Sequence, residues 1–69
     1  MKTKFELDSK WTAHPPRAGW RHFRIVARRY PSKDLLEVEV MAVCDRKVRF
    51  WIPSQQLLDK DKWSTGWLP

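Results

Sequence analysis

Several residue types that often carry chemistry are scarce in this sequence of 69 residues. Cysteine occurs once, at Cys44, so no disulfide can form within the chain. Glycine occurs only at Gly19 and Gly66, which leaves no glycine-rich loop to cradle a phosphate. The histidines, aspartates and lone cysteine show no metal-ligand spacing. We therefore expect neither a metal nor a cofactor.

Long hydrophobic runs are also missing. No apolar stretch approaches the roughly 18 residues that a membrane span requires. The first ten residues alternate charge with Phe5 and Leu7, which is unlike the core of a signal peptide. Together with the single thiol, these absences lead us to expect a cytoplasmic protein without a membrane partner.

Acidic residues are absent from one segment, residues 17–33, which carries five Arg and one Lys. The whole chain has a formal net charge of +6, so this segment holds an excess equal to that of the entire chain. A basic segment of this kind is typical of a surface that binds nucleic acid, although basic patches also serve solubility.

Aromatic residues, by contrast, are abundant. Aromatic side chains make up 13% of the chain and include five Trp. A chain this short forms one domain, residues 1–69, and buries only about 60% of the surface that its unfolded form exposes. Large buried rings are the available reinforcement. We expect Trp11, Trp63 and Trp67 to be buried, and we leave Trp20 and Trp51 open.

The middle of the chain alternates apolar and polar residues with a period of two, which indicates half-buried strands over residues 20–30, 35–44 and 48–52. Matching the apolar faces predicts a meander with two turns, a four-residue loop at 31–34 and a three-residue loop at 45–47. This register sets the following pairs opposite each other: Ile25 with Val40, Ala27 with Val38, Val40 with Ile52, Ala42 with Phe50, and Arg28 with Glu37. It also places Arg24 diagonal to Glu39.

The flanking segments complete the fold. We expect an extended N-terminal segment with a bend near residues 8–9, then a loop over 14–19, because Pro15 and Pro16 cannot donate to a sheet ladder. Residues 54–58 suit one helical turn after Pro53. The sequence thus predicts an all-β fold, a small SH3-like barrel built on a three-stranded antiparallel meander with one short helical turn. This fold-level analogy implies no particular function.

Several stretches together resemble a small bacterial family of tryptophan-rich proteins of unknown function. The resemblance lies in KFELDSKWTA at 4–13, GWRHF at 19–23, MAVCDR at 41–46, RFWIP at 49–53 and WSTGWL at 63–68. It implies a bacterial, cytoplasmic protein, and it supplies no catalytic or binding residues.

The strongest candidate site is a basic and aromatic patch at one end of the meander. Clustered Arg and Lys suit phosphates, and an aromatic face suits an unstacked base. We predict that this patch binds RNA or single-stranded DNA through Arg17, Trp20, Arg21, Arg46, Lys47 and Arg49. The alternative is a protein-interaction module, or a small subunit of a larger assembly, that uses an exposed patch including Met41 and Trp51.

An enzymatic function is not expected. The register places Cys44 on the apolar face and His22 on the opposite face, so a buried, reduced thiol is the better interpretation than a nucleophile. The acidic residues Asp45, Asp59 and Asp61 are too scattered to form a carboxylate pair. We expect a monomeric, non-enzymatic binding module.

Overall fold

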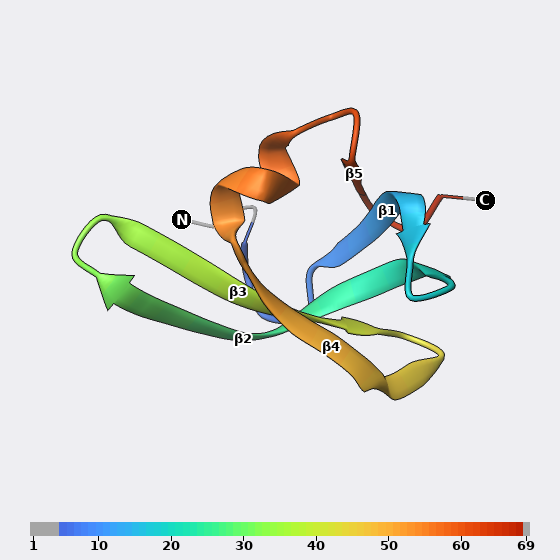
Figure 1. Ribbon diagram of the computed structural model, residues 1–69, viewed down its shortest axis with the longest axis horizontal. Helices are drawn as coiled ribbons and strands as arrows, with labels where there is room; N and C mark the ends of the chain where they lie inside the picture. Colours follow the sequence, from blue (N-terminus) through green and yellow to red (C-terminus); the bar gives the residue numbers. More distant parts are fainter. Residues whose placement is uncertain (1–4, 69) are drawn as a thin grey trace.

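The computed structural model describes residues 5–68 and consists of five antiparallel strands in one sheet (Figure 1). The strand order in the sheet is β4-β3-β2-β1-β5. The elements in chain order are β1 (Lys10–Arg17), β2 (Trp20–Ser32), β3 (Leu35–Ala42), β4 (Asp45–Pro53), the 3₁₀ turn η1 (Ser54–Leu58) and β5 (Trp63–Thr65). The all-β class, the three-stranded meander and the short helical turn are confirmed. Among the described residues no pairing joins β4 to β5, so the sheet is open.

One face of the sheet, the inner face, carries the hydrophobic core. Alternate residues of the strands point into it, as the period of two requires. Figure 1 shows η1 lying over this part of the sheet, and Leu57 of η1 is 2% exposed. The buried core cluster consists of Trp11, Ala13, Phe23, Ile25, Val38, Val40, Ala42, Ile52, Leu57 and Trp63. The burial predicted for Trp11 and Trp63 is confirmed.

A β-bulge in β2 corrects the predicted pairing with β3. Ile25 lies opposite Val40 as expected, but Ala27 lies opposite Glu39 and not Val38. One extra residue of β2, Val26, is therefore accommodated between two paired positions. Alternation alone does not reveal such an insertion, because each half of the strand keeps its own period.

The bulge also changes the ion pairs on the opposite, outer face. Glu37 is paired with Arg29, whose Nε lies 2.8 Å from Glu37 Oε1, so the predicted pair with Arg28 is wrong. The predicted contact of Arg24 with Glu39 is wrong as well, because Arg24 lies 3.2 Å from Asp8 Oδ1. The change at Glu37 follows from the one-residue offset beyond Ile25. Arg24 precedes the bulge and keeps its place opposite Met41, and it contacts Asp8 of the N-terminal segment instead of Glu39.

The β3–β4 connection is tighter than expected. The turn is formed by Val43 and Cys44, so β4 already begins at Asp45. The pairing then skips from Ala42–Asp45 to Met41–Arg49, so residues 46–48 are extra in β4 and Val40 lies opposite Phe50 rather than Ile52. The predicted pairing is therefore wrong by two residues. Because side chains alternate between the two faces with a period of two, each residue still lies on the face predicted for it. The β2–β3 turn is likewise shorter, with Ser32 opposite Leu35.

The two prolines near the N-terminus lie within β1 and not in a loop. β1 runs through Pro15 and Pro16 to Arg17, which corrects the loop predicted over residues 14–19. The prolines still lack the backbone N–H that a sheet ladder needs. The pairing of β1 with β2 accordingly skips from Thr12 to Arg17. Only Ala18 and Gly19 remain as the turn.

The β1–β2 turn contains a residue, Ala18, whose replacement should stabilise the fold. Ala18 has φ of 51° and Gly19 has φ of 82°, the signature of a two-residue hairpin turn in which asparagine followed by glycine is preferred. A left-handed conformation is costly for alanine and is better tolerated by asparagine. Ala18→Asn should therefore raise the free energy of unfolding by about 0.5–1 kcal/mol. Thermal unfolding followed by circular dichroism should show a midpoint several degrees higher.

The matched variant Ala18→Val should lower the midpoint, because a β-branched side chain is poorly tolerated at positive φ. If Ala18→Asn were no more stable than Ala18→Val, the turn would not have this backbone conformation in solution.

Candidate functional site

The topology brings two separate turns to the same end of the sheet. Strands β2 and β3 are antiparallel to their neighbours, so the β1–β2 turn (residues 18–19) and the β3–β4 turn (residues 43–44) lie at one end, on the right of Figure 1. The β2–β3 turn lies at the opposite end, at the tip of a long hairpin. We call the first end the hairpin end. It carries the sequence-predicted residues Arg17, Trp20, Arg21, Arg46 and Lys47.

Two members of this set are partly structural. Arg17 and Trp20 lie opposite each other across the turn, and both are half-buried. The Arg17 guanidinium carbon lies 5.6 Å from the Trp63 ring centroid and 5.8 Å from that of Phe50, so it covers the edge of the core. Trp20 packs against the core cluster and keeps part of its surface in solvent. The structure thus resolves Trp20 as half-buried.

The other members are exposed cations. Arg21, Arg46 and Lys47 are all exposed. The nearest acidic residue in sequence, Asp45, uses its carboxylate to accept a hydrogen bond from the Lys47 backbone N–H at 3.0 Å. Within residues 5–68 neither the Arg46 nor the Lys47 side chain forms an ion pair. The charges of Arg46 and Lys47 are therefore presented to solvent.

Arg49 stands apart from the other cations of the predicted patch. It lies opposite Met41 on the outer face, and its Nε is 3.9 Å from Glu39 Oε2. The nearby carboxylate offsets the positive charge, so Arg49 contributes less to the potential at the hairpin end. The register predicted from the sequence brings Arg49 nearer the turn, because it places the turn at residues 45–47.

The alternative patch, which includes Met41 and Trp51, exposes little apolar area at these two residues. Met41 is 7% exposed and lies between Arg24 and Arg49, its partners on the two neighbouring strands. Trp51 is half-buried, and the Arg29 guanidinium lies 4.1 Å from its ring centroid. Neither side chain therefore offers the open apolar surface that a protein contact through this patch would use.

The predicted burial of Cys44 is wrong. Cys44 is exposed, because the turn falls on Val43 and Cys44 and not after them. His22 makes a different contact: its Nε2 lies 2.6 Å from the Leu68 carbonyl oxygen.

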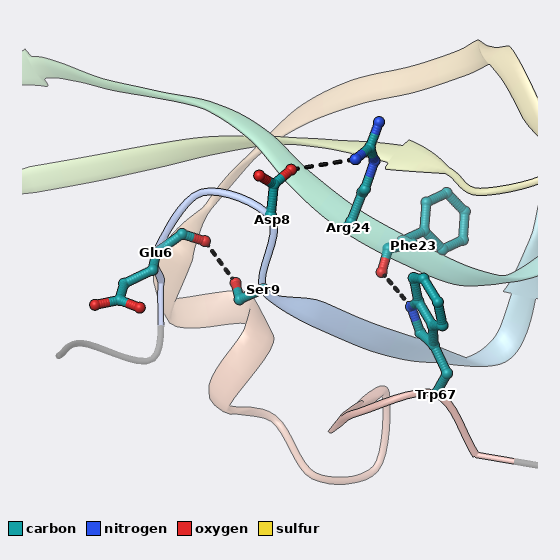
Figure 2. A network of polar contacts seen from close by, with 6 residues as sticks. All are labelled: Glu6, Asp8, Ser9, Phe23, Arg24 and Trp67. Atoms are coloured by element: carbon teal, nitrogen blue, oxygen red, sulfur yellow. Dashed lines mark hydrogen bonds and ion pairs between the residues drawn. The ribbon is translucent and has the colours of Figure 1, made fainter.

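A second aromatic feature was missed by reasoning from the sequence. Trp67, which was expected to be buried, is 40% exposed. Its indole N–H donates to the Phe23 carbonyl oxygen at 2.9 Å, and Figure 2 shows the ring rising from the C-terminal segment toward β2. His22 stacks on it at 6.1 Å between centroids, and Lys10 Nζ lies 4.8 Å from the ring centroid.

The signal that could have revealed this feature is the sequence after β5. Gly66 has φ of 81°, a value that glycine tolerates, and it turns the chain just before Trp67. A strand that ends at Thr65 cannot carry Trp67 into the same core as Trp63.

Other kinds of site are not evident in the part of the chain that the structure describes. Residues 5–68 contain no group of three or more potential metal ligands and no enclosed pocket. The same residues contain no helix with the length and apolar character that crossing a membrane demands. The surface features at the sheet remain as the candidates for binding.

Comparisons with known proteins identify the family. Searches of curated proteins and of solved structures each gave no significant match. The family described as Tryptophan-rich protein (DUF2389) matches residues 9–68, which is most of the chain, and confirms the resemblance noted from the sequence. The chain therefore belongs to this tryptophan-rich protein family of unknown function.

Proposed function

We propose that this chain is a small, non-enzymatic module that binds single-stranded RNA or DNA at the hairpin end. The observation that carries the proposal is the convergence of two turns that are distant in sequence. Residues 17–21 and 45–47 together supply four cations, one acidic residue and a half-exposed indole at one end of the sheet. Phosphates require clustered cations, and an unpaired base requires an aromatic face.

The contacts of each residue at the hairpin end indicate its role in binding. Arg21, Arg46 and Lys47 are exposed and contact phosphates, which lowers the cost of bringing the polyanion to the protein. Trp20 is anchored on the core by part of its ring, so its remaining surface is a rigid platform for a base. Arg17 is held over the rings of Phe50 and Trp63 and sets the shape of this end.

The SH3-like barrel and the cytoplasmic location are part of the same proposal. β2 has 13 residues; its first part pairs with β1 and its later part with β3, with the bulge between Ile25 and Ala27. A long, bent strand shared by two parts of a sheet, with a 3₁₀ turn before the last strand, supports an SH3-like barrel. The exposed free thiol of Cys44 supports a reducing cytoplasm, as the resemblance to bacterial proteins also does. We propose that the module acts there as a monomer.

The test is the double variant Arg46→Ala/Lys47→Ala. Removing two phosphate contacts should weaken binding of a labelled oligonucleotide by about tenfold, or about 1.4 kcal/mol. The slope of log affinity against log salt should become shallower by about 1.4, since each contact to a single strand contributes about 0.7. Fluorescence anisotropy between about 50 mM and about 200 mM salt measures both quantities.

The matched control is Lys33→Ala/Lys60→Ala, which removes the same net charge away from the hairpin end. Lys33 lies in the β2–β3 turn and Lys60 follows η1, and both are exposed. This variant should retain nearly the affinity of the unaltered protein. An equal loss in both double variants would mean that only overall charge matters, and an absence of binding by the unaltered protein would refute the proposal.

A further inference from the structure

The C-terminal segment forms a strap that holds an exposed indole on the outer face of the sheet. Gly66 N–H donates to the Lys10 carbonyl oxygen at 2.8 Å, and Leu68 N–H donates to Thr12 Oγ1 at 2.9 Å. The Thr12 hydroxyl in turn donates to the Gly66 carbonyl oxygen at 2.7 Å. The Trp67 ring is anchored by its own N–H on β2, so its position is fixed before any ligand arrives.

This indole has cationic neighbours on the same face. Lys10 and Arg24 lie opposite each other on β1 and β2, and Lys10 Nζ lies above the Trp67 ring. Arg24 contacts Asp8, whose side chain is 76% exposed, so that pair is open to solvent and highly screened. The area around Trp67 thus combines an aromatic face with accessible positive charge.

The strap is also continuous with the hairpin end. His22, which stacks on Trp67, directly follows Arg21 in β2 and lies two residues from Trp20. Strand residues rise by about 3.3 Å each, so only about 7 Å of strand separates the position of Trp20 from that of His22. A chain of phosphates bound at Arg21 can therefore cross this end of the sheet and reach the outer face beside Trp67.

We propose that Trp67 is a second base-stacking platform, and that a single strand runs from the hairpin end along the outer face past Trp67. This inference rests on the proposed function and deepens it by assigning the path of the ligand. One base stacks on Trp20 and a later one on Trp67. The Lys10 ammonium, carried on a flexible four-carbon stem, moves from the ring face to a phosphate and leaves that face open to the base.

The deciding experiment compares Trp67→Ala with Tyr30→Ala. Tyr30 is a matched control because it is an aromatic residue, 69% exposed, near the far end of β2. Anisotropy is measured with labelled oligo-dT and oligo-U of about 12 nucleotides and with an abasic strand of equal length. Trp67→Ala should weaken binding of the two strands with bases by about 5- to 150-fold. It should leave binding of the abasic strand nearly unchanged, and Tyr30→Ala should resemble the unaltered protein throughout.

Because Trp67→Ala also removes a hydrogen bond of the strap, Trp67→Phe is measured alongside it. Phenylalanine keeps a stacking face but cannot donate to the Phe23 carbonyl, so it should retain most of the affinity for strands with bases. Equal binding by Trp67→Ala and Tyr30→Ala would overturn the inference while leaving the hairpin-end site in place. If Trp67→Ala lost as much affinity for the abasic strand as for the strands with bases, the inference would also be overturned, because the loss would then come from a changed protein structure and not from a lost base contact. If the unaltered protein bound none of the three strands, both the inference and the proposed function would fall.

Discussion

Replacing Phe23 with alanine should leave little of the domain folded at 25 °C. Phe23 is 0% exposed and lies at the centre of the inner face. Its ring meets those of Phe50 and Trp63 edge-on, at 5.7 Å and 5.6 Å between centroids. Losing a buried phenylalanine typically costs about 3–5 kcal/mol. A core this small supplies a net stability of about that size, so the two quantities nearly cancel.

Urea unfolding followed by circular dichroism measures this effect. The midpoint of Phe23→Ala should fall close to zero denaturant, whereas Phe23→Leu, which leaves a smaller void, should retain a measurable transition. Tyr30→Ala is the control, because it truncates a ring that is 69% exposed and should change the midpoint little. A Phe23→Ala midpoint close to that of Tyr30→Ala would contradict the assignment of Phe23 to the centre of the core.

Thr12→Val should be the most damaging change on the outer face. Thr12 is 0% exposed, and its hydroxyl both donates to the Gly66 carbonyl oxygen and accepts from Leu68 N–H. Valine has nearly the same shape but satisfies neither group. Leaving a buried donor or acceptor without a partner costs about 1–3 kcal/mol, so the free energy of unfolding should drop by at least about that amount.

The control for Thr12→Val is Thr65→Val on β5, where the side chain is exposed. Hydrogen exchange separates a local from a global effect: the amide of Leu68 should lose protection in Thr12→Val well before those of the core strands. If Thr12→Val and Thr65→Val behaved alike, the hydroxyl of Thr12 would not hold the C-terminal strap.

The strands and their faces could be predicted from sequence because alternation is a local property. The inner-face positions Ile25, Val38 and Val40 were identified correctly, and so was the helical turn over residues 54–58. The errors lie where the chain departs from a regular period. The bulge after Ile25 and the early turn at Val43 change which residues face each other, and neither leaves a mark in the pattern of apolar residues.

The candidate site was predictable to a similar degree. The hairpin end depends only on antiparallel order, which places the turns after Arg17 and Ala42 at one end whatever the register. The place of Arg49 depends on the register, and the register was shifted by two residues. Trp67 depends on a turn at Gly66 and on a carbonyl group of β2, so its position could not be inferred from its neighbours in sequence.

The sequence by itself thus determined an all-β chain with aromatic reinforcement and an excess of positive charge in residues 17–33. These properties follow from composition and from the period of two. Only the tertiary structure decided how that charge is used: Arg24 and Arg29 are paired with acidic residues, while Arg46 and Lys47, outside the segment, face solvent at the hairpin end. The physical reason is that register, bulges and the strap are set by hydrogen bonds between groups that are distant in the sequence, which no local pattern encodes.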